Sequence, residues 1–317
     1  MHGSKLWFLL ARMKRVALFG ATGHIGKGII CKYPANEWQL TLFSRNAANV
    51  GRFLDEQSLT YEFVEIRGYD DFLGGDYDVV INAAGPGDPG KIRESSADIL
   101  EITEYFDNLV LRYLANHPTS AYINISTGAL YGDANEGMAC ETSLFSVPLN
   151  KPADRYFWYR VAKLNSEAKH RAQPRLPIAD IRVFGYFTRF IDPNGTFFLS
   201  EVVRCLQDKR SFDTDDSDFV RDYIGMDEIM DLIEKLINAG IPNGAYDIYS
   251  ARPTTKWQLL EVLRQRFELS CKNPPEHRKP CPSVISHYDR IAGIGYHPRR
   301  TSIEVVVSEM AALLHSS

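Results

Sequence analysis

Apolar and polar positions along the chain follow two alternating patterns. Stretches with apolar residues three and four positions apart predict helices, among them 94–115 and 153–171. Between such stretches, short apolar runs bounded by turn residues predict strands buried on both faces, at 16–19, 39–44, 61–66, 78–82, 121–126 and 178–184. This alternation predicts an α/β fold with a Rossmann-type, doubly wound and mostly parallel sheet.

The regular alternation loosens beyond residue 185. We expect a loop at 193–195, an acidic turn at 213–218, a strand at 246–250, a proline-rich basic loop at 274–282 and helices at 197–206, 226–239, 256–267 and 303–314. The chain therefore divides into an NAD(P)-binding domain at 13–185, to which some later segments return, and a smaller C-terminal substrate lobe formed mainly by 186–317. Residues 1–12 are left out of both, as a leader or a disordered segment.

Three glycines follow the first predicted strand at intervals of three residues. In a strand, turn and helix unit, Gly20 would permit the tight turn, Gly23 would let the backbone approach a pyrophosphate, and Gly26 would let the helix pack on the strand. The first N–H groups of the helix would then bind the phosphates. The expected cofactor contacts are Gly20, Thr22, Gly23, His24, Ile25 and Gly26. Because glycine-rich turns are common, this motif needs support from the rest of the chain.

The second predicted strand ends at Ser44 and Arg45, and this end bears on the choice of cofactor. An acidic residue here would bind the ribose 2′-hydroxyl of NAD, whereas an arginine suits the 2′-phosphate of NADP. The motif has Arg45 and no acid, so NADP(H) is the preferred cofactor and NAD(H) the second choice. The alternative is that Arg45 is a solvated surface side chain.

Small residues end the fourth predicted strand, and a threonine follows the fifth. The fourth strand runs into Asn82, Ala83, Ala84 and Gly85, whose small side chains leave room for a ligand. Thr127 occupies the corresponding place after the fifth. The carboxyl ends of parallel strands share one edge of the sheet, so we expect the cofactor site at this edge.

Tyr159 and Lys163 lie four residues apart in the predicted helix 153–171 and therefore share one of its faces. A free tyrosine has a pKa of about 10, which makes it a poor proton shuttle near neutrality. A nearby ammonium group favours the phenolate, so we expect Lys163 to bring Tyr159 within reach of general acid or base chemistry. The alternative is an ordinary pair on an amphipathic surface.

Composition and charge argue against several classes of partner. The net charge is −4 and no basic run is present, so we expect no nucleic acid. The five cysteines and eight histidines show no metal-ligand spacing, so we expect no metal. No apolar run is long enough for a transmembrane span, so we expect no membrane association. Cysteines without a disulfide framework are typical of reduced thiols in the cytoplasm.

Taken together, the motifs resemble those of the extended short-chain dehydrogenase/reductases, in particular the NAD-dependent epimerase/dehydratase family, which acts on nucleotide sugars. The matching segments occur in the family's order: G-A-T-G-H-I-G at 20–26, N-A-A-G at 82–85, S-T-G-A-L-Y-G at 126–132, Y-R-V-A-K at 159–163, I-R-V-F-G at 181–185, R-D-Y-I at 221–224 and Y-D-I-Y-S at 246–250. The similarity extends from about residue 13 to the C-terminus.

The resemblance implies a catalytic set formed by Thr127, Tyr159 and Lys163. Thr127 would bind the substrate oxygen, Tyr159 would exchange a proton with it, and Lys163 would hold the nicotinamide ribose. Both Tyr159 and Lys163 would therefore also contact the cofactor. The family further implies a homodimer through helices 94–115 and 153–171.

Two arginines are the expected ligands of the substrate's phosphates. By resemblance, Arg221 would bind the diphosphate, for which a guanidinium offers bidentate donors. The alternative for Arg221 is a structural ion pair with Asp218 or Asp222. Arg278, in the basic loop, would be a second phosphate ligand or a solvated side chain.

Departures from the family pattern narrow the reaction. Dehydratases carry an Asp-Glu pair after the catalytic threonine, where this chain has Gly128 and Ala129, so we do not expect dehydration. Neither Cys140 nor His170 fits the extra acid/base pair of enzymes that epimerise neighbouring carbons, and we expect both to be structural. Gly185 stands where the family favours an asparagine, which leaves the sugar's contacts there open.

These observations lead to one main hypothesis and two alternatives. The main hypothesis is an NADPH-dependent reductase of a nucleotide-linked 4-keto-6-deoxy sugar, of the kind used in the synthesis of bacterial surface polysaccharides. The first alternative is a nucleotide-sugar 4-epimerase that retains NAD; Arg45 favours the reductase, because a reductase exchanges NADPH at every turnover. The second is a non-catalytic NADP-binding sensor, against which the presence of Tyr159 and Lys163 argues.

Overall fold

The computed structural model describes residues 13–59, 63–87, 90, 92, 98–131, 143, 157–277, 279–280 and 289–315. The expected phosphate ligand Arg278 lies outside the described residues, as do Cys140 and the segment 1–12.

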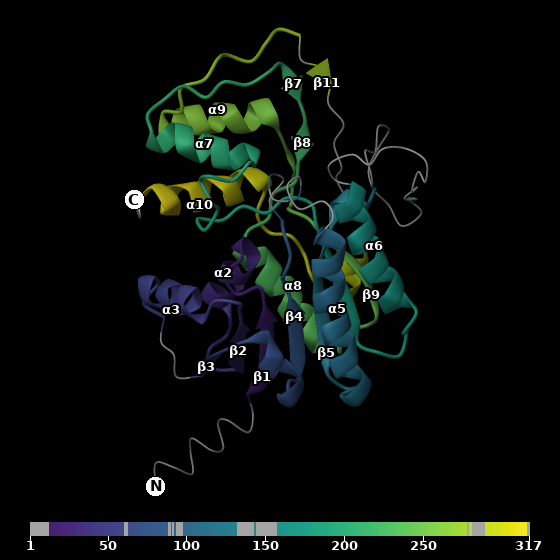
Figure 1. The fold of residues 1–317 in the computed structure, drawn as a ribbon. Helices are drawn as coiled ribbons and strands as arrows, with labels where there is room; N and C mark the ends of the chain where they lie inside the picture. Colours follow the sequence, from purple (N-terminus) through teal and green to yellow (C-terminus); the bar gives the residue numbers. More distant parts are fainter. Residues whose placement is uncertain are drawn as a thin grey trace.

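A seven-stranded parallel sheet forms the centre of the molecule's larger part (Figure 1). Its order is β3-β2-β1-β4-β5-β6-β9. The strands are β1 (Lys14–Phe19), β2 (Trp38–Phe43), β3 (Val64–Arg67), β4 (Val79–Asn82), β5 (Ala121–Thr127), β6 (Ile178–Val183) and β9 (Gly244–Ile248). The predicted α/β fold with a Rossmann-type parallel sheet is thus confirmed, with strand ends that differ by a few residues.

The bounds of β9 differ from the predicted 246–250. Gly244 and Ala245 pair with Ala179 and Asp180 of β6 and therefore belong to the sheet. Ser250 leaves the sheet, because its backbone N–H donates to the Asp222 carboxylate at 2.9 Å.

The order of the strands reverses at β1, which pairs with β2 on one side and with β4 on the other. Phe19 at the end of β1 lies opposite Phe43 of β2 and Asn82 of β4. The residues that follow these three strands therefore lie side by side at the sheet's carboxyl edge. In open parallel sheets, ligands bind in the crevice at such a reversal.

Helices cover both faces of the sheet (Figure 1). Helices α2 (His24–Lys32), α3 (Ala47–Glu56) and α8 (Met226–Asn238) share one apolar core with the strands, and α5 (Asp98–Asn116) contributes to a second core on the opposite face. Helix α6 (Phe157–Arg171) packs beside α5 on that face. Most of the buried residues of α6 are polar, namely Lys163, Ser166, Glu167 and His170.

Helix α3 is absent from the elements that the sequence predicts. It forms because the side chain of Asn46 caps its first turn, accepting a hydrogen bond from the N–H of Asn49 at 3.2 Å. Val50, Phe53 and Leu54 then bury one face of the helix in the core.

A smaller C-terminal lobe lies above the carboxyl edge of the sheet in Figure 1. It contains α7 (Phe198–Gln207), α9 (Lys256–Phe267) and α10 (Ser302–His315), with its own apolar core. Short pairs of strands border it, β8 (Val220–Arg221) with β10 (Thr254–Thr255) and β7 (Ser217–Asp218) with β11 (Lys279–Pro280). Between these segments, α8 and β9 return to the sheet. Three 3-10 turns complete the described elements: η1 (Tyr69–Gly74), η2 (Gly128–Tyr131) and η3 (Asp289–Ile294).

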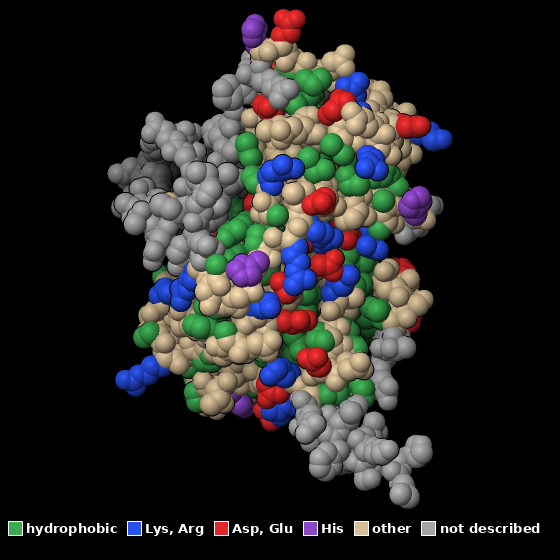
Figure 2. All heavy atoms as spheres, turned by 180° about the vertical axis from the view of Figure 1, so that it is seen from behind, with side chains coloured by type: hydrophobic (Ala, Val, Ile, Leu, Met, Phe, Trp, Pro, Cys, Tyr) green, Lys and Arg blue, Asp and Glu red, His purple; other side chains and the backbone are tan. Residues whose placement is uncertain are grey.

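Acidic and basic side chains alternate across the face that Figure 2 shows. Ion pairs on the α2 side include Lys32 of α2 with Asp227 of α8 at 2.7 Å, and Arg300, which precedes α10, with Glu228 of α8 at 2.7 Å. Within the described part of the chain, no helix combines the length and apolarity that crossing a membrane requires.

Candidate active site

The glycine turn after β1 has a backbone that only glycine accommodates at two positions. Gly20 has a φ of +79°, and a Cβ there would lie 2.5 Å from the carbonyl oxygen of Ala83. A Cβ on Gly26 would lie 2.2 Å from the carbonyl oxygen of Gly20. The turn therefore packs against the end of β4 on one side and against α2 on the other, as the sequence predicts.

Helix α2 starts at the turn with no side-chain cap. Its N-cap is Gly23, which has no side chain to occupy the first N–H groups of the helix. These groups, and the small residues around them, fit the pyrophosphate of a dinucleotide. Of the other predicted contacts, Thr22 is exposed and Ile25 packs against the apolar core.

The His24 ring points away from the position expected for the phosphates. Its Nε2 lies 2.9 Å from the Thr188 hydroxyl, and the ring packs edge-on against Tyr186 with centroids 4.7 Å apart. Burial lowers the pKa of His24 to about 4, so the imidazole is neutral near pH 7. His24 therefore offers a phosphate its backbone N–H, and its ring ties the glycine turn to the segment after β6.

The end of β2 is arranged as a short polar turn. The buried Ser44 hydroxyl accepts a hydrogen bond from the N–H of Asn46 at 3.1 Å, and Arg45 between them is exposed. Because Asn46 also caps α3, the backbone on both sides of Arg45 is fixed.

Asn82, predicted as a cofactor contact, is buried and uses its side chain within the protein. Its amide nitrogen donates to the Tyr122 hydroxyl at 3.0 Å, and its Oδ1 accepts from the N–H of Ala84 at 3.1 Å. The side chain thus shapes the turn through Ala83, Ala84 and Gly85, which the structure brings next to Gly20.

Three polar contacts at successive turns attach α6 to the end of β5. The Tyr159 phenol interacts with the Thr127 side chain, and Lys163 Nζ donates to the carbonyl oxygen of Ile125 at 2.8 Å. One turn further, Glu167 accepts a hydrogen bond from Ser126 at 2.6 Å. The structure therefore brings Thr127, Tyr159 and Lys163 together at the carboxyl edge of the sheet.

The pKa of Tyr159 differs from the sequence-based expectation. Burial raises the pKa of the phenol above its usual value, and the interaction with Thr127 offsets only part of this effect. Burial likewise lowers the pKa of Lys163, although the negative charges of Asp107, Asp180 and Glu167 act in the opposite direction. The pKa of Tyr159 is therefore raised where the sequence predicts that Lys163 lowers it, and Tyr159 is a neutral phenol near pH 7.

A buried charged cluster beneath α6 is the part of this region that the sequence analysis missed. His170 lies between two carboxylates, with Nε2 2.7 Å from Asp107 and Nδ1 2.8 Å from Asp180. Glu167 is held by Arg182, with Nη2 at 2.6 Å. Three acids, a histidine and an arginine, contributed by α5, α6 and β6, thus replace the apolar contacts that usually join a helix to a sheet.

The substrate side of the site contains two glycines packed against neighbours. A Cβ on Gly128 would lie 2.3 Å from the Phe184 ring, so this ring fills the space that a side chain at position 128 would need. A Cβ on Gly185 would lie 2.5 Å from the carbonyl oxygen of Asp222. Gly185 pairs with Ile224 through the N–H of Ile224 at 3.0 Å, which keeps the two backbones this close.

We expect Gly185→Asn, the residue that the family favours, to destabilise the protein by about 1–3 kcal/mol, because its Cβ would push against backbone that cannot move freely. Thermal unfolding followed by circular dichroism measures this. Gly293→Asn is the matched control, because a Cβ at position 293 meets nothing within 4 Å. Equal unfolding temperatures for the two variants would show that the backbone around position 185 accommodates the side chain without a loss of stability.

Arg221 lies in the C-terminal lobe beside an aromatic ring. Its guanidinium is 4.5 Å from the centroid of Phe219, and Nη1 donates to the carbonyl oxygen of Val220 at 3.0 Å. Asp222, an alternative partner considered for Arg221, accepts hydrogen bonds from Ser250 and Ser302 instead.

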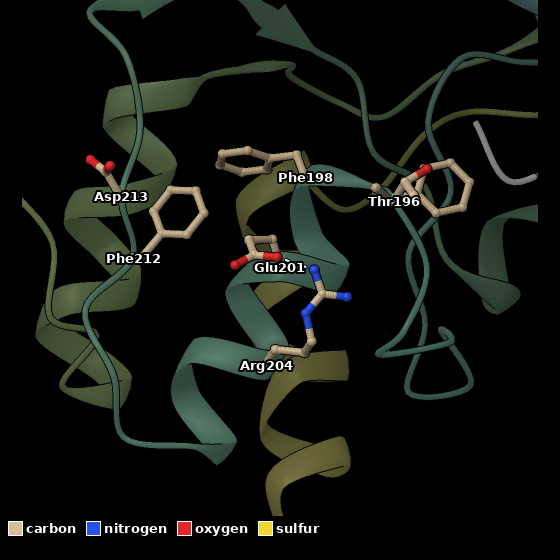
Figure 3. Close-up of a pocket in the computed structure, with 7 residues that line it drawn as sticks. Thr196, Phe198, Glu201, Arg204, Phe212 and Asp213 are labelled. Atoms are coloured by element: carbon tan, nitrogen blue, oxygen red, sulfur yellow. Dashed lines mark hydrogen bonds and ion pairs between the residues drawn. The ribbon is translucent and has the colours of Figure 1, made fainter. Parts of the chain in front are cut away.

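A pocket of about 390 Å³ lies in the same lobe, at the start of α7 (Figure 3). It is lined by Thr196, Phe197, Phe198, Glu201, Arg204, Phe212 and Asp213. Phe198 packs edge-on against Phe212 with centroids 5.5 Å apart, whereas Phe197 is exposed. The pocket thus combines aromatic rings with the ion pair formed by Glu201 and Arg204.

No group of three or more His, Cys, Asp or Glu side chains suited to a metal ion occurs among the residues with described positions. Cys31, Cys205 and Cys271 are free thiols.

Comparison with known families decides the class of this site. The model of the NAD dependent epimerase/dehydratase family matches residues 16–249, which is most of the chain. The chain belongs to this family.

Solved structures of family members share the fold over nearly the whole chain. The UDP-glucose 4-epimerase of Thermotoga maritima is 17% identical, with 95% of this chain and 99% of that chain covered and a TM-score of 0.75. The UDP-N-acetylglucosamine 4-epimerase of Methanobrevibacter ruminantium is 16% identical, with 96% of this chain and 99% of that chain covered and a TM-score of 0.76. The dTDP-glucose 4,6-dehydratase of Bacillus anthracis, solved in complex with NAD, is 15% identical, with 96% of this chain and 97% of that chain covered and a TM-score of 0.74. No curated protein matches the sequence.

Membership of the epimerase/dehydratase family makes this chain an NAD(P)-dependent enzyme of the extended short-chain dehydrogenase/reductase type. The resemblance seen in the sequence motifs is thereby confirmed. Family membership does not distinguish epimerisation, dehydration and reduction, so the reaction must be argued from the residues of this site.

Proposed function

We propose that this protein is an NADPH-dependent reductase of a nucleotide-linked 4-keto-6-deoxy sugar, of the kind used for bacterial surface polysaccharides. The observation that carries the proposal is that Tyr159 lies beside Thr127 at the edge of the sheet that also carries the glycine turn and Arg45. Both the proton donor and the cofactor-binding elements thus belong to one site.

The protonation state of Tyr159 supports the direction of the reaction. When bound, the nicotinamide supplies a hydride to the carbonyl carbon of the sugar. The oxygen then needs a proton, and a phenol whose pKa is raised by burial holds that proton at neutral pH. Thr127 orients the same oxygen, and Lys163, fixed by the carbonyl of Ile125, would hold the nicotinamide ribose.

Gly128 and Phe184 argue against dehydration. Elimination of water needs an additional acid beside the catalytic threonine, and the family's dehydratases place one at the position of Gly128. Here the Phe184 ring occupies the space for any side chain at that position, with 2.3 Å to the hypothetical Cβ. This packing favours chemistry at a single carbon.

For the substrate's nucleotide we propose a place in the C-terminal lobe. The Arg221 guanidinium is held in place by Phe219 and would bind the diphosphate. The aromatic rings of Phe197 and Phe198 line the nearby pocket and would contact the base (Figure 3).

The choice of NADPH rests on Arg45. We expect Arg45→Ala to raise the Kd for NADPH by 10-fold or more while the Kd for NADH changes little, because a charge-assisted hydrogen bond to a phosphate contributes about 1.5–3 kcal/mol. Titration of cofactor fluorescence measures both constants. Arg52→Ala, on an exposed position of α3, serves as the control for the loss of one positive charge. Equal changes for the two cofactors would mean that Arg45 does not select NADPH.

The second candidate is a 4-epimerase with retained NAD, which the names of several structural neighbours favour. An assay at 340 nm separates the two. The purified protein is mixed with NADPH, then with NADH, and with CDP-, dTDP-, UDP- and GDP-linked 4-keto-6-deoxy sugars. Oxidation of NADPH with one nucleotide class supports the reductase, whereas interconversion of sugar epimers without added cofactor supports the epimerase.

We also propose a homodimer through α5 and α6. Tyr105 on α5 and Trp158 on α6 are large aromatic side chains that remain 52% and 39% exposed. Exposed aromatic residues on adjacent helices are typical of an interface. A monomer in gel filtration would contradict this proposal.

A further inference from the structure

The hydroxyl of Tyr69 lies at the mouth of the glycine turn. It accepts a hydrogen bond from the backbone N–H of Gly20 at 3.2 Å. Tyr69 begins η1, shortly after β3 ends at Arg67. The side chain thus reaches from the end of β3 past β2 to the end of β1, across the edge at which the cofactor is expected.

Three aromatic neighbours fix the position of the Tyr69 ring. It lies edge-on to Phe19 with centroids 5.1 Å apart, tilted on Phe106 at 4.6 Å, and nearly parallel to Phe43 at 6.1 Å. Phe19 and Phe43 directly precede Gly20 and Ser44, the first residues of the two loops. The hydroxyl is therefore fixed at Gly20, and the ring packs on the strand residue that leads into the Ser44–Arg45 turn, close enough for the charge of Arg45 to act on the phenol.

This location corresponds to the adenosine ribose of a dinucleotide. In this fold the pyrophosphate lies at the start of the first helix, and the end of the second strand contacts the ribose 2′ position. A group placed between the first glycine and Arg45 is thus directed at the 2′ substituent, which distinguishes NADP from NAD.

The Tyr69 hydroxyl is also in the right protonation state to bind an anion. Burial raises its pKa, although the hydrogen bond from Gly20 and the positive charge of Arg45 act in the opposite direction. The phenol is therefore protonated near pH 7. A hydroxyl that accepts from a backbone N–H still has its own hydrogen to donate, and a phosphate oxygen is a strong acceptor.

We propose that Tyr69 is a specificity-determining residue that donates a hydrogen bond to the 2′-phosphate of NADP, while Arg45 balances its charge. This inference rests on the proposed use of NADPH. The 2′-phosphate would then have two ligands: the charged Arg45, which the sequence pattern indicates, and the neutral hydroxyl of Tyr69 from the loop after β3.

Adenosine 2′,5′-bisphosphate and AMP test the proposal, because they differ only in the 2′-phosphate. We expect Tyr69→Phe to weaken binding of the bisphosphate by about 10-fold, as for the loss of one hydrogen bond to a charged group, and binding of AMP by less than about 2-fold. Isothermal titration calorimetry measures both. NADPH and NADH, followed by fluorescence, should show the same difference.

Tyr77→Phe is the matched control. The Tyr77 ring belongs to the same aromatic cluster, stacked on Phe72 with centroids 5.4 Å apart, and its hydroxyl is buried in the protein. Both variants lose one phenolic oxygen from this cluster. We expect Tyr77→Phe to bind the bisphosphate like the wild type.

The outcomes separate this inference from the proposed function. A wild type that prefers NADPH, with a Tyr69→Phe variant that keeps the full preference, overturns the role of Tyr69 alone. Equal losses for the bisphosphate and AMP also overturn it, because Tyr69 would then contact the adenosine without reading the 2′ position. A wild type that binds NADH more tightly than NADPH overturns both the role of Tyr69 and the proposed cofactor.

Discussion

Tyr159→Phe is expected to abolish turnover almost completely, with a loss in kcat of about 10²- to 10⁴-fold, the usual contribution of a general acid. The variant keeps the ring on α6 and loses only the hydroxyl beside Thr127. Because the phenol supplies the proton and Phe has none, binding of NADPH should change little. Steady-state kinetics on the sugar identified at 340 nm, together with cofactor titration, measures the two effects separately.

The control for Tyr159→Phe is the same substitution at a tyrosine outside the site. Tyr33 follows the last turn of α2, at the end of this helix away from the glycine turn, so Tyr33→Phe removes a phenolic oxygen without touching the site. Its kcat should match that of the wild type. If Tyr159→Phe turned over at a similar rate, Tyr159 would not be the proton donor. A wild type that binds NADPH but turns over none of the sugars would instead favour the non-catalytic sensor.

The second large effect concerns the stability of the folded protein and comes from His170. Both nitrogens of its ring lie within 2.8 Å of a carboxylate oxygen, from Asp107 and Asp180. An ionised carboxylate only accepts hydrogen bonds, so both nitrogens must carry a hydrogen and the ring is a cation. Burial alone would lower the pKa of His170, but the two carboxylates outweigh it and raise the pKa to about 9.

This raised pKa makes the stability of the protein depend on pH in the alkaline range. The pKa of a histidine in the unfolded chain is about 6.5. The stabilisation is therefore fully present below pH 6.5 and is lost as the pH rises through about 9. We expect the contribution of His170 to the free energy of unfolding to fall by an amount on the order of 3 kcal/mol between pH 6 and pH 10. Urea unfolding at several pH values measures it.

Substitution of His170 should act more strongly than the change in pH. His170→Ala removes the cation that two buried carboxylates share and leaves each with one cationic partner, Lys169 at 2.6 Å from Asp107 and Arg171 at 2.9 Å from Asp180. The loss of this buried partner is expected to cost about 3–5 kcal/mol. The exposed His297→Ala is the control and should leave the stability unchanged. If His170→Ala retained the wild-type free energy of unfolding and the same alkaline dependence, the ring would not be the shared cation of this cluster.

The sheet and its order of elements were predictable because their signals are local. Apolar runs, glycine turns and periodic helices are each contained in a short stretch of sequence, and the motif order added the family. Helix α3 was missed because its apolar face consists of only Val50, Phe53 and Leu54 and its start depends on the Asn46 cap. The bounds of β9 were displaced because the strand ends at Ile248, opposite Val183 at the end of β6, and this pairing partner is distant in sequence.

The candidate site likewise contains residues that the sequence predicts and residues that only the fold brings together. Thr127, Tyr159 and Lys163 could be assigned together because the family fixes their order, and the structure places them side by side. The cluster around His170 could not be predicted, because positions 107, 170 and 180 belong to three elements that meet only in the fold. The pKa of Tyr159 was predicted in the wrong direction for a related reason. The sequence shows that Lys163 is four residues away but not how deeply the phenol is buried.

The most direct test of the reductase is the fate of the transferred hydrogen. The protein is incubated with its nucleotide-linked keto sugar and NADPH that carries deuterium at nicotinamide C4, and the product is examined by mass spectrometry. Net reduction predicts one deuterium per product molecule and one NADPH consumed for each. A product without deuterium, formed while NADPH stays unconsumed, would contradict the reductase and indicate an epimerase that recycles its own cofactor.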